Sequence, residues 1–448
     1  MCSQWKLKIA VFQMELGMLL GRLINQILFP LFLLSIFVFL FVHKPYSGVN
    51  TPTYTEFTLI RQPLFALFLS VFHWAGRYQF TLAMWAQGLL TISGFAYARS
   101  WLKKNLNMSD LFIIPAFFFA LFTISFHYQI YSLDDPEGIS FPLFIFAFFQ
   151  LIDCFLKVSY KDIAILSILV SLLVLTRTQF TIFYGTFIVL MGWYLWKKFP
   201  LKYIFGCLFI FMLSAVFTNV LDRTYHYYKN DHFSTEPFSG ILTVIQPLYL
   251  ANSNAAQYFK NPEEKNIVEK IQKKIQMAQL NHDVFAYKPT SIQYYEYLNN
   301  EYAENYLAIQ DITNKNITHI SFFKIQDADN LSLIKMDELT LDISKILFFH
   351  NVKKNVILYF YKVIDSFGGI PDFLFFSLLM LFSLMKVFQN RSMNMSSGQI
   401  FLFLMLTITF FNAMVVAVAE PNCTRYFCYT QFLLYCFGAY LAERISDS

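Results

Sequence analysis

Residues 25–43 read NQILFPLFLLSIFVFLFVH, an apolar run that contains no Asp, Glu, Lys or Arg. A helix that crosses a bilayer needs roughly 20 mostly apolar residues, so this run predicts a membrane span. Further runs of the same kind lie near 79–98, 109–127, 140–156, 162–176, 180–196, 203–221, 370–387, 398–418 and 427–442. We therefore expect an all-α polytopic membrane protein with about ten transmembrane helices.

The composition of the whole chain favours the same class. Its 448 residues are 56% hydrophobic and only 14% charged, whereas soluble domains carry roughly 25% charged residues. Phe alone fills 54 positions, and so much apolar surface is expected to face a lipid bilayer. The formal net charge of +5 is small for this length, so we expect no nucleic-acid partner.

Basic residues collect at alternate ends of the expected spans and so predict the orientation. The connections on one side contain Arg99, Lys103, Lys104, Lys157, Lys161, Lys197, Lys198, Lys202, Lys386, Arg391 and Arg444. Cytoplasmic loops carry an excess of Lys and Arg, so both termini are expected in the cytoplasm. No small-residue cleavage site follows the first apolar run, which we therefore expect to be retained as an anchor.

One long polar segment interrupts the spans. Residues 222–357 are rich in Asn, Lys, Asp, Glu and Tyr and are long enough to fold as a small domain. We expect an α-rich or mixed domain on the non-cytoplasmic side, between an N-terminal transmembrane region at 1–221 and a C-terminal one at 358–448. Within it, residues 263–280 show helical spacing of apolar side chains and predict an amphipathic helix.

Two expected outer loops contain candidate acids and bases. The first includes Glu56, and the second has Asp134, Asp135 and Glu137 within four positions. Such carboxylates can act as a general acid or base. The three in the second loop are also candidate ligands of a divalent cation. Alternatively, they cap the helix that follows and fill its first turn.

Arginines near the same expected face are candidate phosphate ligands. Arg61 ends the first loop, Arg177 separates two closely spaced spans, and Arg425 precedes Tyr426 in the last outer turn. A guanidinium group is planar, stays protonated and binds phosphate through two parallel hydrogen bonds. The simpler interpretations are that Arg177 extends toward the membrane surface and that Arg425 is an ordinary helix-end charge.

The order of these features resembles the GT-C class of membrane glycosyltransferases. The resemblance is greatest to the bacterial branch related to protein O-mannosyltransferases and aminoarabinose transferases. Its first-loop pattern is matched by Asn50-Thr51-Pro52-Thr53-Tyr54 and Arg61-Gln62-Pro63-Leu64-Phe65, and its later motifs by Leu133-Asp134-Asp135-Pro136-Glu137, Thr176-Arg177-Thr178 and Arg425-Tyr426. The resemblance covers most of the expected membrane region and does not extend to residues 222–357.

The resemblance implies inverting transfer of a sugar from a polyprenyl-phosphate donor to a lipid, glycan or protein acceptor. It places the reaction at the periplasmic face of a bacterial inner membrane. Arg61, Arg177, Arg425 and Tyr426 would bind the donor phosphate, and a metal would not be required. The family's first-loop carboxylate is usually the catalytic base or helps position the acceptor, but Asn50 occupies that position here.

An amide does not act as a proton acceptor in this way, so Glu56, Asp134 or Asp135 would have to supply the base. The alternative is that the chain has lost transfer activity.

Two other functions also fit a polytopic chain with a large outer segment. One is a flippase or transporter of lipid-linked oligosaccharides, and the other is a glycan polymerase or ligase.

Overall fold

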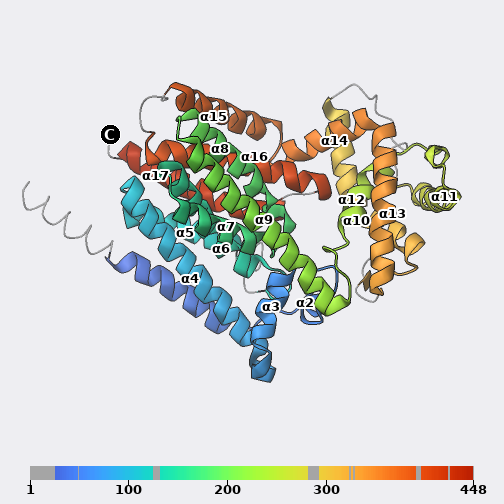
Figure 1. The fold of residues 1–448 in the computed structure, drawn as a ribbon, viewed down its shortest axis with the longest axis horizontal. Coiled ribbons are helices and arrows are strands. Elements are labelled where there is room, and N and C mark those ends of the chain that lie inside the picture. The colour runs from blue at the N-terminus through green and yellow to red at the C-terminus, as the bar shows by residue number, and fades with distance from the viewer. Residues whose placement is uncertain are drawn as a thin grey trace, which may run out of the picture.

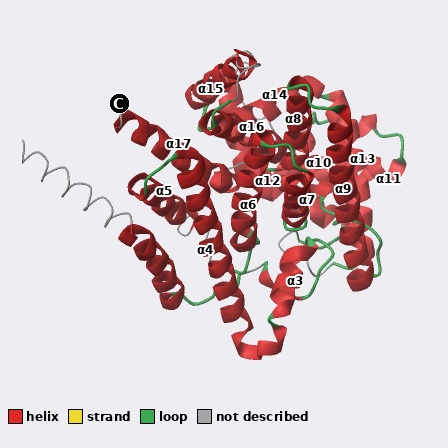
Figure 2. Cartoon of the chain, turned by 60° about the vertical axis from the view of Figure 1, so that its left-hand side comes forward, coloured by secondary structure: helices red, strands yellow, loops and turns green. Residues whose placement is uncertain are grey.

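The structure, a computed structural model, describes residues 26–48, 50–124, 132–280, 292–321, 324–325, 328–389, 395–421 and 424–446. Every regular element in these ranges is a helix, and Figure 2 shows only helices and loops in the described chain. The connection between Tyr46 and Ser132 is an isolated bridge that holds two loops together.

The membrane bundle consists of the helices that fall on the expected spans. These are Gln26–Val42, α4 (Gln79–Leu106), α5 (Asp110–Phe122), α6 (Glu137–Leu156), α7 (Tyr160–Val174), α8 (Ile182–Trp196), α9 (Leu201–Asn230), α15 (Ile370–Gln389), α16 (Ser397–Ala419) and α17 (Cys428–Ser446). In the described chain, α6, α9, α15 and α16 are long and apolar enough to cross a membrane. These helices indicate an α-helical membrane protein.

The four long apolar helices differ in how deeply they are buried. Of the 18-residue apolar stretch of each helix, 78% is buried in α6 and 72% in α16. Both helices therefore lie inside the bundle. In α9 and α15 only 22% and 11% is buried, so large apolar side chains on both helices face outward. Figure 1 shows α15 along one edge of the bundle. Such apolar surfaces are stable against lipid.

The polar segment folds into an insertion domain, which we define as α10 to α14. It comprises α10 (Ser239–Leu250), η4 (Ala255–Tyr258), α11 (Pro262–Met277), α12 (Ile292–Ile317), α13 (Asn330–His350) and α14 (Val352–Asp365). The domain lies beside the bundle (Figure 1) and has an apolar core of its own. The described part of this domain is therefore α-helical, and α11 overlaps the amphipathic helix expected at 263–280.

Helices cross both of the domain boundaries expected from the sequence. The boundary at 221/222 lies inside α9, which continues to Asn230, and the boundary at 357/358 lies inside α14. Within the insertion domain, α10 packs closely against α13. Gly240 in α10 donates a backbone hydrogen bond of 2.5 Å to Asp337 in α13, and a Cβ at Gly240 would collide with the backbone carbonyl oxygen of Asp337.

Short helical elements connect consecutive helices of the bundle. They are α2 (Thr51–Thr55), α3 (Pro63–Val71), η1 (His73–Tyr78), η3 (Thr178–Thr181) and η7 (Thr424–Phe427). The backbone N–H of Leu64 donates to the carbonyl of Leu175 at 3.0 Å. The hydroxyl of Tyr306 in α12 donates to the carbonyl of Ala419 at 3.2 Å. These bonds hold the loops, the bundle and the insertion domain against one another.

Candidate functional site

A cavity of about 450 Å³ lies where the chain around α2, η3 and η7 meets α10 and α16. Its wall comes from distant parts of the sequence. Its polar lining includes Asn50, Tyr54, Arg61, Gln62, Asp135, Arg177, Thr178, Gln179, Thr181, Glu236, Glu420 and Tyr426. The cavity therefore brings together acidic and basic groups from both halves of the membrane bundle and from the segment between α9 and α10.

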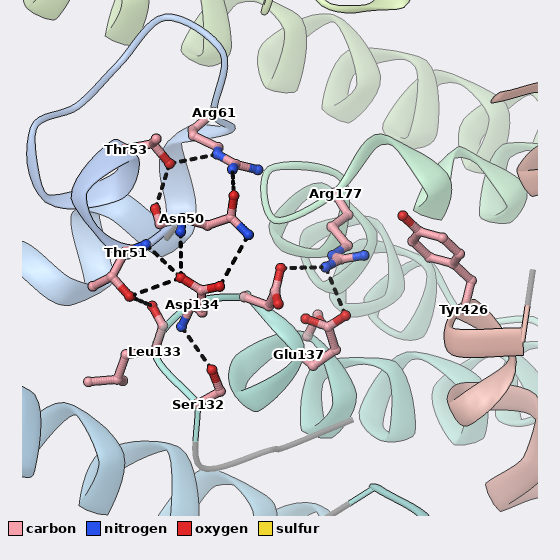
Figure 3. Close-up of polar contacts among 12 residues, drawn as sticks. Asn50, Thr51, Thr53, Arg61, Ser132, Leu133, Asp134, Glu137, Arg177 and Tyr426 are labelled. Atoms are coloured by element: carbon pink, nitrogen blue, oxygen red, sulfur yellow. Dashed lines mark hydrogen bonds and ion pairs between the residues drawn. The ribbon is translucent and has the colours of Figure 1, made fainter. Parts of the chain in front are cut away.

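The Asp134 carboxylate holds the start of α2 in place. Its Oδ1 accepts from the backbone N–H groups of Asn50 at 2.6 Å and Thr51 at 2.8 Å, and its Oδ2 accepts from the Asn50 side-chain amide at 3.2 Å (Figure 3). The Thr51 hydroxyl also donates to Oδ1 at 3.2 Å. A carboxylate placed at unpaired helix N–H groups stabilises the helix start. Asp134 stands behind the cavity wall and does not line it.

Asn50 connects this carboxylate to Arg61. The Arg61 guanidinium donates to the Asn50 amide oxygen at 2.5 Å and to the Thr53 hydroxyl at 2.8 Å. Its plane also lies over the Tyr54 ring, with the guanidinium carbon 4.8 Å from the ring centre. These contacts fix the direction of Arg61 through neutral partners and an aromatic face, which leaves its positive charge available to the cavity.

Arg177 is fixed by acids from the second loop. Its Nη2 lies 2.8 Å from Glu137 Oε1 and 3.5 Å from Asp135 Oδ1. The Glu137 side chain is only 3% exposed, against 20% for Asp135. The guanidinium carbon also stands 5.3 Å from the centre of the Tyr426 ring (Figure 3). The short pair with buried Glu137 therefore anchors Arg177, and the longer pair with Asp135 faces the cavity.

Glu236 is a cavity residue that the sequence did not single out. It follows α9, and its Oε1 accepts a 2.5 Å hydrogen bond from the side-chain amide of Gln62. Burial raises the pKa of the Glu236 carboxyl to about 8, and the negative charge of Asp222 adds to the increase. The nearby charge of Arg61 lowers this pKa by less. Glu236 therefore holds its proton at neutral pH far more readily than an ordinary carboxyl does.

The last turn contributes Glu420 and Tyr426 to the cavity wall. The Tyr426 hydroxyl donates to Glu420 Oε1 at 3.2 Å, and the Tyr426 backbone carbonyl accepts from the Asn412 amide at 2.9 Å. Tyr426 is thus held from both ends beside Arg177. The expected phosphate ligand Arg425 belongs to η7, but its side chain lies outside the described part of the structure.

Glu56 and the expected metal ligands are placed differently from the arginines. Glu56 is exposed at the end of α2 and is not part of the cavity wall. In the described chain, no group of three or more His, Cys, Asp or Glu side chains is arranged to hold a metal ion. Asp134 faces the α2 amides, whereas Asp135 and Glu137 face Arg177.

A second cavity, of about 470 Å³, adjoins the first. The two share wall residues that include Gln62, Thr178, Glu236 and Leu242. The second extends along α9 and is lined mainly by apolar atoms. Most of the apolar surface of α9 is exposed, so α9 lies at the outside of the bundle. The second cavity therefore connects the polar cavity to an apolar space beside an outer helix.

Comparisons of the chain with protein-family models, curated proteins and solved structures find no significant match. Of the residues singled out from the sequence, those in the cavity wall are Asn50, Tyr54, Arg61, Asp135, Arg177 and Tyr426. Asp134 and Glu137 contact wall residues from behind, and Glu56 stands apart.

Proposed function

We propose that the chain is a membrane glycosyltransferase of GT-C type. It moves a sugar from a polyprenyl-phosphate donor to a lipid, glycan or protein acceptor. The observation that carries this proposal is the placement of Arg61 and Arg177 in the wall of one cavity that adjoins an apolar space beside α9. A polyprenyl-phosphate sugar needs an apolar path for its lipid and cations for its phosphate.

The direction of the bundle supports transfer at the non-cytoplasmic face. Helix α6 begins with Glu137 behind the cavity and ends at Leu156, about 30 Å away for a helix of this length. Trp101 in α4 donates to Asp153 near that far end, and Arg99 and Lys103 of α4 belong to the same region. The positive-inside rule then assigns the basic end to the cytoplasm and the cavity to the periplasmic side.

In the proposed reaction, the acceptor hydroxyl oxygen forms a bond to the anomeric carbon of the sugar, and its proton passes to a carboxylate of the site. The bond from that carbon to the phosphate oxygen breaks, and its electron pair remains on the leaving polyprenyl phosphate. Arg61 and Arg177 stabilise the charge that develops on the phosphate. They are already oriented by Asn50, Glu137 and the aromatic rings, so little reorganisation is needed during the reaction.

Asp135 is the group that the phosphate would displace. It lies 3.5 Å from Arg177 and is more exposed than Glu137, so it can be hydrated when the phosphate takes its place. Glu137 remains as the buried anchor of the guanidinium. The insertion domain contributes α10 to the wall, and we assign to this domain the shaping of the acceptor site.

The test is release of polyprenyl phosphate by the full chain in lipid nanodiscs, with polyprenyl-phosphate sugars as donors and a cell-envelope lipid extract as acceptor. Arg177→Ala is expected to lower the rate by about 100-fold or more, and Arg177→Lys by less because the charge remains. Arg77→Ala is the matched control, since Arg77 is exposed in η1 and contacts Tyr78. It is expected to retain the wild-type rate.

Two results would contradict the proposal. One is full activity of both Arg177 variants, with folding checked by gel filtration and melting temperature. The other is movement of the donor from one leaflet to the other without release of polyprenyl phosphate, because that result would indicate a flippase.

A further inference from the structure

Among the described residues, three carboxylates line the cavity, and they differ in what holds them. Asp135 lies 3.5 Å from the guanidinium of Arg177. Glu420 accepts a hydrogen bond from the hydroxyl of Tyr426. Glu236 instead accepts from the neutral side-chain amide of Gln62. Asp135 is therefore paired with a cation while no phosphate is bound, whereas a neutral amide orients Glu236.

Glu236 also stands at the junction of the two cavities. Glu236 and its partner Gln62 belong to the walls of both. A group at this junction can contact a molecule held in the polar cavity while the lipid of the donor occupies the apolar one. Its position therefore suits contact with an acceptor hydroxyl at the reacting carbon.

We infer that Glu236 is the catalytic base that takes the proton of the acceptor hydroxyl. This inference rests on the proposed sugar transfer. As the acceptor oxygen bonds to the anomeric carbon, its proton passes to the Glu236 carboxylate, which becomes a carboxylic acid. The carbon–oxygen bond to the phosphate breaks in the same step, and its electron pair leaves with the polyprenyl phosphate. Gln62 positions the carboxylate through its amide N–H.

The charges around Glu236 match this role. Burial is the main cause of its raised pKa of about 8, and the carboxylates of Asp222 and Asp337 raise it further, whereas Arg61 and Arg177 lower it. His226 faces Asp222 from one helical turn further along α9, with His226 Nε2 3.5 Å from Asp222 Oδ1. A base whose pKa lies near the working pH both ionises and accepts a proton effectively.

This assignment also accounts for Asn50. The first-loop position that carries a carboxylate in the resembling family carries an amide here, and the nearby Asp134 is bound to the start of α2. A base from the segment between α9 and α10 would make a first-loop carboxylate unnecessary. Asn50 is then a positioning residue for Arg61.

The test compares Glu236→Gln with wild type in the polyprenyl-phosphate release assay across pH 6 to 9.5. For wild type, kcat is expected to rise with pH and to level off above about 8. Glu236→Gln is expected to lower kcat by about 100-fold or more, to lose the rise with pH, and to leave the donor KM within about twofold. Glu263→Gln, an exposed site in α11, is the matched control and keeps the wild-type profile.

Chemical rescue separates a base from a merely structural residue. Added formate is expected to restore part of the activity of Glu236→Ala, because formate can occupy the vacated space and accept the proton. An active wild type together with a Glu236→Gln variant that keeps the wild-type kcat and pH profile would overturn this inference and leave the proposed function standing. If wild type itself releases no polyprenyl phosphate, the proposed function is overturned.

Discussion

The side-chain amide of Asn50 donates to the Asp134 carboxylate at 3.2 Å, and the same amide accepts from Arg61 at 2.5 Å. An amide can donate and accept at once, which an ionised carboxylate cannot do. Asp134 is already used as an acceptor by two backbone N–H groups. The side chain at position 50 must therefore donate to Asp134 and accept from Arg61 at the same time, and an amide can do both.

Asn50→Asp is expected to destabilise the protein. It would place two carboxylates in contact and remove a donor from Asp134, at a cost of about 1–3 kcal/mol in the free energy of unfolding. Adding Asp134→Asn is expected to recover part of this loss, because the exchanged pair again contains one amide and one carboxylate. The measurement is chemical unfolding of the four proteins of this cycle in detergent micelles.

The cycle has a clear contrary outcome. Neighbouring residues that share hydrogen bonds show coupling energies of about 0.5–3 kcal/mol. If the two substitutions add without coupling, the amide–carboxylate contact contributes nothing to stability. Asn266→Asp, at an exposed position of α11, is the control for the added negative charge and is expected to change little.

The aromatic ring of Tyr426 is expected to matter more than its hydroxyl. Tyr426→Phe keeps a ring beside the Arg177 guanidinium and removes the hydroxyl that donates to Glu420. We expect at most about a fivefold fall in kcat/KM for the donor, which corresponds to one ordinary hydrogen bond. Tyr426→Leu removes the ring as well, and the lost cation–π contact is expected to bring the fall to about tenfold or more. Equal effects of the two substitutions would contradict this assignment.

The raised pKa of Glu236 predicts a pH dependence of stability. In the folded protein the carboxyl keeps its proton up to about pH 8, whereas in the unfolded chain it loses the proton near about pH 4.3. Folding therefore takes up a proton between these values, so the contribution of Glu236 to stability is largest at low pH and declines until about pH 8. In Glu236→Gln the amide takes up no proton on folding, so this contribution to the pH dependence of stability is lost.

The measurement is the melting temperature of both proteins from pH 5 to 9. The variant is expected to gain in relative stability as the pH rises, and the difference should level off above about pH 8. A difference that stays constant over the whole range would show that the Glu236 pKa is unchanged by folding. This readout is independent of catalysis, so it tests the electrostatics of the site separately from the proposed reaction.

Helices of the bundle fall on the apolar runs of the sequence, because apolarity over a helical length is a local property; in the described chain four of them, α6, α9, α15 and α16, are long and apolar enough to cross a membrane. The sequence also placed Arg61, Arg177 and Tyr426 near one face, since alternation of spans fixes which loops share a side. Their roles in binding phosphate stay predictions. The bond from Asp134 to the start of α2 depends on how two loops pack across 84 positions of sequence, and no local pattern specifies that.

Glu236 illustrates what a single sequence does not reveal. It lies in a segment where carboxylates are common, and its tripeptide Thr235-Glu236-Pro237 has no recognised spacing. What distinguishes it is burial beside Gln62, which is a property of the tertiary structure. Its position just after a long apolar helix was a signal that could have been used, because such junctions lie close to the membrane surface.

At the opposite end of the bundle, Asp110 is expected to be important for stability. Its side chain is 0% exposed and accepts from Arg99 at 2.7 and 2.5 Å and from Lys103 at 3.0 Å. Asp110→Asn leaves both cations without their carboxylate at the start of α5. Arg99 and Lys103 are 26% and 38% exposed, so water replaces part of the lost interaction. We expect a loss of about 1–3 kcal/mol in the free energy of unfolding and a lower melting temperature in detergent.

The matched control for Asp110 is Asp342→Asn in α13. Asp342 also pairs with a lysine, Lys345, at 3.0 Å, but its side chain is 59% exposed. Exposed pairs contribute little because water screens both charges, so this substitution is expected to change stability by about 0.5 kcal/mol or less. Equal losses from the two substitutions would mean that burial does not set the strength of the Asp110 cluster. A larger loss at Asp110 would identify this cluster as the electrostatic anchor between α4 and α5.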